Sequence, residues 1–545
     1  MSHPSGPDPG VERRWWPRAL LAVGAVLLAL VFGITTASVE SSLGPHEARY
    51  DVTTDDTVTV DLGPLGTLQI DSPLPLTLGV RVTVQEIPAS VTELDQSKTL
   101  QALSGDLQSY LQFFSGPQAT VQDVARALVT QALERTALAL VVLVAAWWLF
   151  RVLLGAARRA ELRQQVRPHL RSGLAAAVAV ALVATVLTSS LGQRDQPTAS
   201  RPASAVFDGT PLEGARVTGR LGGVIDTYGG QVVAELRKNE KFYASANASL
   251  KAAWDDRADT LAAWPAPEPT ASSSASPTPV DEADLVTVVL VSDLHCNVGM
   301  APLIRTLVQR SKADLVLDAG DTTLNGTSVE QYCVTTFARA VPAGVELVTS
   351  PGNHDSRQTT KNYAKAGATV LDGSVIEVDG LRILGDRDPN ETRVGAGGTA
   401  LAGKESAQDE ADRLAEVACD DGDGVDLLLI HTPAVGEEAL ASGCVPAQIS
   451  GHLHKRYGPE RLGLGVRYIS SSTAGATLGQ PTVGPLNGIA ELTVLRWDPG
   501  TRRFVDYQLV QVRPDATASV SPRLRWPAAP EEPAPAGPRG TPSPV

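Results

Sequence analysis

Three long apolar runs constrain this chain more than any other feature of its sequence. They cover residues 19–39, 136–157 and 172–193, and the first and third contain no charged residue. About 20 apolar residues cross the hydrocarbon core of a bilayer as a helix, so we predict three transmembrane helices over these ranges. Two alternatives stay open: residues 1–37 are a cleaved signal peptide, or 172–193 is the buried helix of a globular domain.

Arginine placement predicts the orientation of these helices. Arg13, Arg14 and Arg18 precede the first run, and the loop 158–171 is rich in arginine. Because arginine gathers on the cytoplasmic side, residues 1–18 and the loop are expected inside. The chain after residue 193 is then extracytoplasmic, in a multi-pass protein of the cell membrane. If 172–193 does not span, the same half lies in the cytosol.

Composition divides the rest of the chain. Residues 40–134 are rich in threonine and valine and then show helical spacing, which predicts an extracytoplasmic β-rich segment followed by a helix. Residues 194–264 form a second small segment, and the Pro/Ser-rich stretch 265–284 is predicted to be a linker. The Pro-rich tail 513–545 is predicted to be disordered. Between linker and tail, 285–512 alternates apolar strands with amphipathic helices, which indicates a layered α/β domain.

Polar residues of one kind follow the apolar strands of 285–512. Five histidines lie beyond residue 169, and each follows a strand. The motifs occur in the order D-x-H, G-D, G-N-H-D, H and G-H-x-H; their residues are Asp293, His295, Asp321, Asn353, His354, Asp355, His431, His452 and His454. Because strand-end loops carry the chemistry of α/β folds, we expect these side chains to converge.

This ordered set resembles the calcineurin-like metallophosphoesterase superfamily over roughly 285–512. The resemblance implies a four-layer α/β sandwich in which two mixed sheets pack together between helices. It also implies two divalent metal ions. Asp293, His295 and His454 would bind the first, Asn353, His431 and His452 the second, and Asp321 would bridge both. His354 would be the general acid, with its imidazole oriented by Asp355.

The ligand types narrow the choice of ion. Mixed imidazole and carboxylate donors suit Mn, Fe or Zn better than Mg or Ca, and the sequence does not choose among the three. Two such cations would offset the charge of a phosphate ester, lower the pKa of a water and align its attack.

The four cysteines fit an outer location, where thiols oxidise. Three pairings are open, and our choice is Cys296 with Cys333 and Cys419 with Cys444.

Together these features predict a membrane-anchored, dinuclear-metal phosphoesterase that hydrolyses phosphate mono- or diesters. The alternative is a catalytically inactive membrane binding or scaffold protein with the same fold. The formal charge of −14 argues against a nucleic-acid partner. The membrane anchor favours lipid-linked or envelope-derived phosphate esters, although a flexible linker also permits soluble ones.

Overall fold

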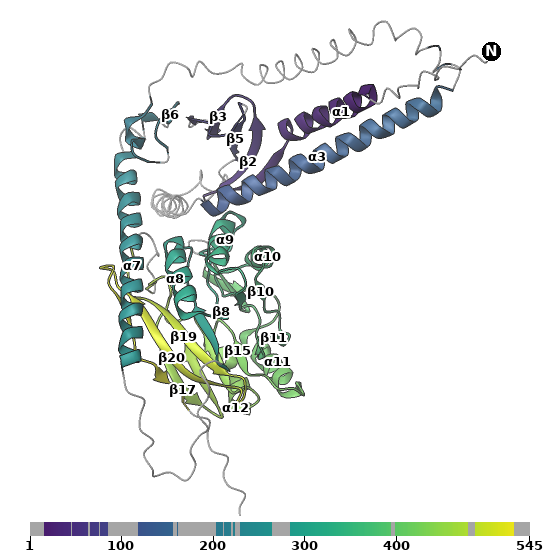
Figure 1. The fold of residues 1–545 in the computed structure, drawn as a ribbon. Helices are drawn as coiled ribbons and strands as arrows, with labels where there is room; N and C mark the ends of the chain where they lie inside the picture. Colours follow the sequence, from purple (N-terminus) through teal and green to yellow (C-terminus); the bar gives the residue numbers. More distant parts are fainter. Residues whose placement is uncertain are drawn as a thin grey trace, which may run out of the picture. The chain divides into compact units, whose positions relative to one another are not determined.

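The computed structural model describes most of the chain as helices, strands and defined loops (Figure 1). The described residues are 16–44, 46–63, 66–75, 77–85, 118–155, 158, 161, 203–210, 212–219, 222–223, 229–263, 284–393, 398–477 and 485–527. They fall into two compact units. One comprises Met1–Ser41, Ala48–Gln85 and Val121–Gly230, and the other Ser42–Glu47, Glu86–Thr120 and Gln231–Val545.

The first unit contains a six-stranded sheet and two long helices. The strand order is β1-β2-β5-β3-β4-β6. The strands are β1 (Ser38–Leu43), β2 (His46–Thr53), β3 (Thr57–Asp61), β4 (Thr67–Asp71), β5 (Gly79–Val84) and β6 (Arg216–Val217), and the helices are α1 (Trp16–Thr35) and α3 (Gln118–Leu153). Threonine and valine dominate several of these strands because β-branched side chains fit a pleated surface.

The apolar runs correspond only in part to long helices. Among the described residues, Thr120–Leu153 is the helix long and apolar enough to cross a membrane, and the apolar part of α1, Ala22–Thr35, is shorter. The first run was expected to stay helical to residue 39, but α1 ends at Thr35 and β1 begins at Ser38, so the end of the run, Ser38 and Val39, lies in a strand. The third run, 172–193, lies outside the described residues.

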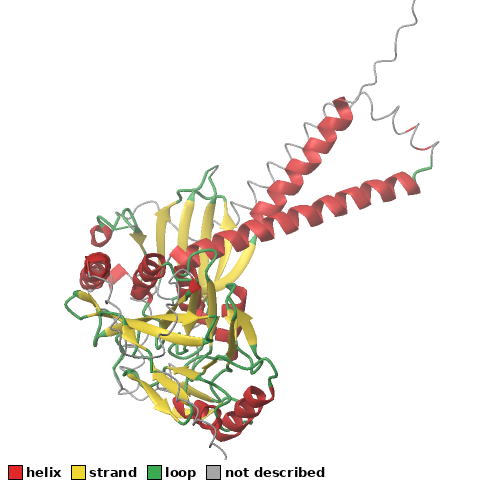
Figure 2. Ribbon diagram, turned by 60° about the horizontal axis from the view of Figure 1, so that its bottom comes forward, coloured by secondary structure: helices red, strands yellow, loops and turns green. Residues whose placement is uncertain are grey.

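The second unit is built on two mixed sheets (Figure 2). The larger has the order β10-β9-β8-β7-β19-β20-β21, with β22 also paired to β20, and the smaller has the order β11-β12-β15-β16-β18-β17. The strands of the larger sheet are β7 (Val286–Val291), β8 (Leu315–Asp318), β9 (Glu346–Thr349), β10 (Thr369–Val370), β19 (Ala490–Asp498), β20 (Arg503–Val512), β21 (Ala518–Val520) and β22 (Leu524–Arg525).

The smaller sheet and the helices complete this unit. The strands are β11 (Ile376–Val378), β12 (Leu381–Leu384), β15 (Leu427–Leu429), β16 (Ala447–Ser450), β17 (Tyr457–Leu462) and β18 (Gly465–Ile469), and a separate hairpin joins β13 (Asn390–Arg393) to β14 (Gly398–Leu401). The helices are α7 (Gly230–Ala263), α8 (Ala301–Ser311), α9 (Gln331–Ala340), α10 (Arg357–Lys365), α11 (Ala407–Asp420) and α12 (Glu437–Ser442).

Three buried clusters define the layers of this unit. The central one packs residues of β7, β8, β19 and β20 against residues of β12, β15, β16 and β18, so the two sheets lie face to face. On the outer side of the larger sheet the core includes side chains of α7, α8 and α9. On the outer side of the smaller sheet, α11 and α12 cover β12 and β15. The predicted mixed α/β fold is confirmed.

Helix α7 changes the expected division of the chain. Its Tyr243, Ala246 and Leu250 are buried in the same core as strand residues of β7. The Tyr243 hydroxyl donates to Asn297 Oδ1 at 2.7 Å, and Arg257 Nε donates to the Val520 carbonyl at 3.1 Å. Residues on both sides of 265–284 therefore belong to one folded unit, so this stretch does not mark a boundary between domains.

The C-terminal boundary also lies later than the sequence indicates. We predicted disorder from residue 513, but β21 and β22 extend the larger sheet by pairing with β20. Trp526 is buried and packs near Phe504, Tyr507 and Tyr468. Burial of the Trp526 ring contributes to the order of this segment. The Pro-rich composition of the tail did not indicate that order.

The favoured cysteine pairing is confirmed. Cys296 is bonded to Cys333, and Cys419 to Cys444, which leaves no free cysteine in the chain.

Candidate metal centre

The expected ligands follow strands that end at a common edge. β7, β8 and β9 run parallel, and Asp293, Asp321 and Asn353 lie beyond their carboxyl ends. β15 and β16 also run parallel, and they are followed by His431 and by His452 with His454. Because the two sheets pack face to face, these loops meet at one end of the sandwich. The seven predicted ligands thus come together from five loops.

One group of donors contains two carboxylates and two imidazoles. Single ligand atoms of Asp293, His295, Asp321 and His454 lie within 4.8 Å of one another. The Nε2 atoms of His295 and His454 are 2.9 Å apart, and His454 Nε2 is 3.5 Å from Asp293 Oδ1. These are the three residues predicted for the first ion, together with the predicted bridge.

A second group shares Asp321. Ligand atoms of Asp321, His431 and His452 also lie within 4.8 Å of one another. Asn353 Oδ1 joins them, at 2.8 Å from His452 Nδ1 and 3.1 Å from His431 Nε2. The geometry brings all seven residues together, with Asp321 common to both groups. Their roles as ligands stay a prediction.

The ligand loops have an unusual backbone. Asp293, His295, Asp321, His452 and His454 all have positive φ, between 40° and 72°. Residues other than glycine rarely adopt this region, and each such residue costs on the order of 1 kcal/mol or more. Backbone strain of this kind is typical of functional sites, where the surrounding structure holds it in place.

Two glycines of the motifs are required by close contacts. Gly320 has a φ of 94°, and a Cβ there would lie 2.6 Å from the Gly352 nitrogen and the Ser350 carbonyl. A Cβ on Gly451 would lie 2.0 Å from Ser292 Oγ and 2.8 Å from Asp293 Oδ2. Glycine therefore lets the G-D loop approach the backbone of the loop that carries Asn353, and lets the G-H-x-H loop approach Asp293.

Burial prepares the imidazoles to act as ligands. Desolvation lowers the pKa of His295 to about 3 and that of His454 to about 4, so both rings are neutral near pH 7. Desolvation raises the pKa of Asp293 to about 7. Metals bind neutral imidazole and ionised carboxylate. A cation near Asp293 would favour the ionised form.

Asp321 and His431 shift each other's pKa. Burial alone would raise the pKa of Asp321, but His431 Nε2 at 3.2 Å holds it below its usual range. The same contact raises the pKa of His431 well above its usual value, despite the burial of that ring. His431 Nδ1 donates to the Ala319 carbonyl at 2.6 Å, so Nε2 faces the site.

The donor set fits divalent cations. Each group combines imidazole nitrogens with carboxylate oxygens, and the second adds an amide oxygen. Mixed N/O donors of this kind suit Mn, Fe or Zn. The site has only two carboxylates, so two divalent cations would leave it with a net positive charge, which favours an anionic substrate.

His354 lies beside the first group, half-buried and edge-on to the His295 ring with 5.1 Å between centroids. Its Nδ1 donates to the Leu324 carbonyl at 2.7 Å. The expectation that Asp355 orients this imidazole is wrong. The carboxylate of Asp355 accepts instead from backbone N–H groups of Gly352, Thr322 and Thr323 and from the Thr323 hydroxyl.

Asp355 therefore links two motif loops through hydrogen bonds. It is fully surrounded by protein, and burial raises the pKa of its carboxyl to about 6. Its backbone partners lie in the loops that carry Asp321 and Asn353. The side chain follows a motif histidine, but it points toward these N–H groups, and no spacing in the sequence reveals that direction.

Sequence reasoning missed Thr392. Asn353 Nδ2 donates to the Thr392 hydroxyl at 2.7 Å, and the Thr392 N–H donates to the Asn353 carbonyl at 2.7 Å. This pair of contacts fixes the amide so that Oδ1 faces His431 and His452. Thr392 lies on β13, in a polar hairpin whose sequence has no motif, so no signal identifies it.

We expect Thr392→Val to weaken divalent cation binding by about 10- to 100-fold, because partners that orient a ligand commonly contribute that much. The matched control is Thr399→Val, which removes the hydroxyl on β14 that lies 2.8 Å from the Thr392 hydroxyl but leaves Asn353 in place. Titration calorimetry with Mn²⁺ measures both. If both variants weakened Mn²⁺ binding equally, the effect would come from damage to the hairpin and not from the loss of the hydrogen bond to Asn353.

The two disulfides provide another matched pair. Replacing Cys296 and Cys333 with serine opens a loop of 37 residues, and replacing Cys419 and Cys444 opens one of 25. Each is expected to lower the free energy of unfolding by about 4 kcal/mol from chain entropy. Cys296 directly follows His295. Only replacement of the first pair should therefore also reduce the amount of metal bound per chain. Thermal denaturation and elemental analysis separate the two effects, and a similar loss of metal in both would contradict this.

Comparison with known proteins finds one matching family model and several distant structural similarities. The family model described as calcineurin-like phosphoesterase matches residues 286–456. A structure described as a novel archaeal phosphodiesterase is 14% identical and covers 42% of this chain and 100% of its own, with a TM-score of 0.27. A structure described as a novel phosphatase of Mycoplasma pneumoniae is 14% identical, with coverages of 42% and 94% and a TM-score of 0.29.

Vps29 of Chaetomium thermophilum is 13% identical, with coverages of 44% and 100% and a TM-score of 0.24. No curated protein matches the chain. The family match spans the five motif loops, from Asp293 to His454. Residues 286–456 of this chain are a calcineurin-like phosphoesterase domain.

Proposed function

We propose that this protein is a membrane-anchored, dinuclear-metal phosphoesterase that acts on the outer side of the cell membrane. The observation that carries the proposal is the pair of donor groups that share Asp321, with His354 beside them. Two divalent cations held there would offset the charge of a phosphate ester and activate a water. The ions would be Mn, Fe or Zn.

The chain's own residues then have distinct tasks. Asp293, His295 and His454 hold one position, and Asn353, His431 and His452 hold the other. Asp321 serves both. His354 faces the first group from its half-buried position, with Nδ1 committed to a carbonyl. Its Nε2 is then the atom that delivers a proton to the leaving oxygen.

Helices α1 and α3 support the membrane anchor. Many apolar side chains on them are exposed, among them Leu27, Phe32, Val141 and Trp147. Apolar side chains on the surface of a helix are stable where lipid surrounds them. The spans we propose are 19–35 within α1, the second apolar run, 136–157, whose described part ends α3, and the third run, 172–193.

The two disulfides support an extracytoplasmic catalytic domain, since disulfides persist in oxidising compartments. Alkaline phosphatase or a fluorescent protein fused after residue 270 tests this location, because each reporter works on one side only. Fluorescence without phosphatase activity would place the domain in the cytosol.

The substrate is a phosphate mono- or diester, and the anchor favours lipid-linked or envelope-derived esters. Hydrolysis of p-nitrophenyl phosphate and bis-p-nitrophenyl phosphate by the full chain with added Mn²⁺ tests the activity and separates the two classes. Bound metal without hydrolysis of either ester would favour the inactive scaffold.

A further inference from the structure

The imidazole of His354 depends on a single loop for its orientation. A carbonyl oxygen only accepts hydrogen bonds, so the contact with Leu324 requires a hydrogen on Nδ1. The same loop also holds the backbone around this histidine. The Thr323 hydroxyl shares its one hydrogen between the Asp355 carboxylate at 2.9 Å and the His354 carbonyl at 3.0 Å, and the Ser356 hydroxyl donates to the Gly326 carbonyl. The ring itself has only the Leu324 carbonyl as its hydrogen-bond partner among the described residues.

One carboxylate holds this loop. Glu330 Oε1 accepts from the N–H groups of Leu324 at 2.8 Å and Asn325 at 3.1 Å. Glu330 Oε2 accepts from the Thr327 N–H at 2.8 Å and the Thr327 hydroxyl at 3.0 Å. Hydrogen bonds to a carboxylate are roughly twice as strong as neutral ones. The peptide group between Leu324 and Asn325 therefore has its N–H bound to Glu330 and its carbonyl bound to His354, and Glu330 also binds the preceding N–H, that of Leu324.

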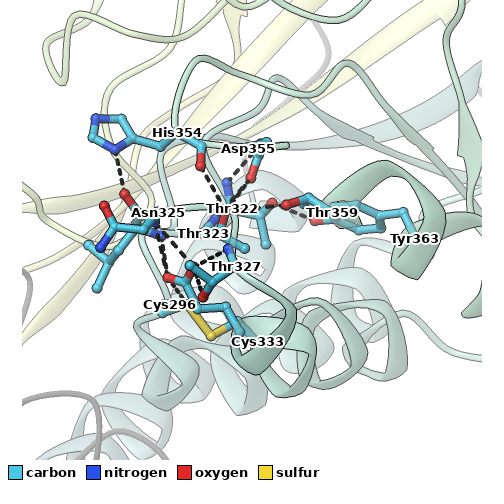
Figure 3. The surroundings of a disulfide bond; sticks show 12 residues. Cys296, Thr322, Thr323, Asn325, Thr327, Cys333, His354, Asp355, Thr359 and Tyr363 are labelled. Atoms are coloured by element: carbon cyan, nitrogen blue, oxygen red, sulfur yellow. Dashed lines mark hydrogen bonds between the residues drawn. A yellow bond between two sulfur atoms is a disulfide. The ribbon is translucent and has the colours of Figure 1, made fainter. Parts of the chain in front are cut away.

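Glu330 is itself firmly placed. It directly precedes α9, and Cys333 in the first turn of that helix is bonded to Cys296. Figure 3 shows Asn325 and Thr327 lying between the His354 ring and this disulfide. A disulfide sulfur, Cys296 Sγ, lies 3.7 Å from Glu330 Oε1. The loop 324–327 thus lies between His354 and the carboxylate of Glu330, and Glu330 is three residues from a disulfide-bonded cysteine.

We infer that Glu330 is a positioning residue for proton transfer. It acts through the Leu324 peptide to hold the His354 imidazole with Nε2 toward the substrate's leaving oxygen. This inference rests on the proposed function, because it assigns Glu330 a part in the same hydrolysis. Glu330 belongs to no motif of the domain, and its spacing from Asp321 has no meaning until the fold is known.

The test is a comparison of two leaving groups. Glu330→Ala in the full chain is assayed on p-nitrophenyl phosphate, whose leaving group needs no proton, and on phenyl phosphate, whose leaving group does. General acid catalysis contributes about 10²- to 10⁴-fold. We expect the ratio of kcat/KM for the two esters to shift by at least about tenfold in favour of p-nitrophenyl phosphate, with bound metal unchanged.

Two further variants separate positioning from stability. Glu330→Gln keeps one oxygen that can accept from Leu324 and Asn325, so we expect a smaller shift in the ratio. Asp426→Asn is the matched control. Asp426 is a buried carboxylate that accepts from the Arg382 N–H and from Arg502 Nε at the opposite end of β15. Asp426→Asn should lower the melting temperature without changing the ratio of kcat/KM for the two esters.

Hydrogen exchange measured by mass spectrometry gives a readout that needs no activity. In Glu330→Ala, amides of 324–327 and of 353–356 should both exchange faster than in the wild type. Faster exchange in the loop alone would overturn the inference, and so would equal losses on both esters. If the wild type hydrolyses neither ester, the proposed function fails, while the exchange data still decide whether Glu330 positions His354.

Discussion

Asp321→Asn is expected to lower kcat/KM for p-nitrophenyl phosphate by at least about 10³-fold, equivalent to about 4 kcal/mol. Asparagine has nearly the same shape but no charge, and Asp321 is common to both donor groups. Its loss removes one of the two negative charges that would hold the cations. It also deprives His431 of the carboxylate 3.2 Å from its Nε2.

Elemental analysis of the purified variant checks this expectation, with bound metal falling from about two ions per chain. Asp426→Asn provides the control, because it also removes the charge of a fully buried aspartate but lies at the other end of the sheet. Unchanged metal content in Asp321→Asn would contradict the shared-ligand arrangement, even if activity were lost.

His354→Ala should give the second largest effect, and that effect should depend on the substrate. We expect a loss of about 10²- to 10⁴-fold on phenyl phosphate, because its leaving oxygen requires a proton. The loss on p-nitrophenyl phosphate should be much smaller. Asn353, whose amide is held by Thr392, keeps its place, so bound metal should stay constant.

The two esters act as controls for each other in this experiment. A damaged metal centre would reduce hydrolysis of both, whereas a missing acid reduces only one. An equal loss on the two substrates would mean that His354 binds the phosphate or supports the fold instead of donating a proton.

The metal-centre residues could be predicted because their positions follow from simple rules. Buried strands read as short apolar runs, and the residues that follow parallel strands meet at one edge. Asp293, Asp321 and His431 satisfy both rules, so their convergence is visible in the sequence. The pairing of the cysteines was one of three open choices, and proximity in the fold decides it.

The partners of these residues could not be predicted. Glu330 and Thr392 act through contacts between loops, and the direction of a loop side chain has no sequence signature. The path of the backbone also decided that Asp355 contacts N–H groups and not the neighbouring imidazole. These contacts depend on tertiary structure, which local patterns do not encode.

Helix α7 shows a different limit of prediction from sequence. Tyr243, Ala246, Leu250 and Trp254 recur at helical spacing, so a buried face was readable. The pattern does not say what covers that face. The Pro/Ser-rich stretch after it resembled a domain boundary, but the helix packs on the larger sheet of the phosphoesterase domain.

The left-handed backbone of five expected ligands has a consequence for ion selection. Residues other than glycine keep such conformations only where the surrounding structure holds them, and close contacts at Gly320 and Gly451 lie beside these loops. We expect this backbone to limit how far the ligand side chains can shift toward an ion of a different radius. Discrimination among Mn, Fe and Zn would then depend more on radius and coordination number than on adjustment by the protein.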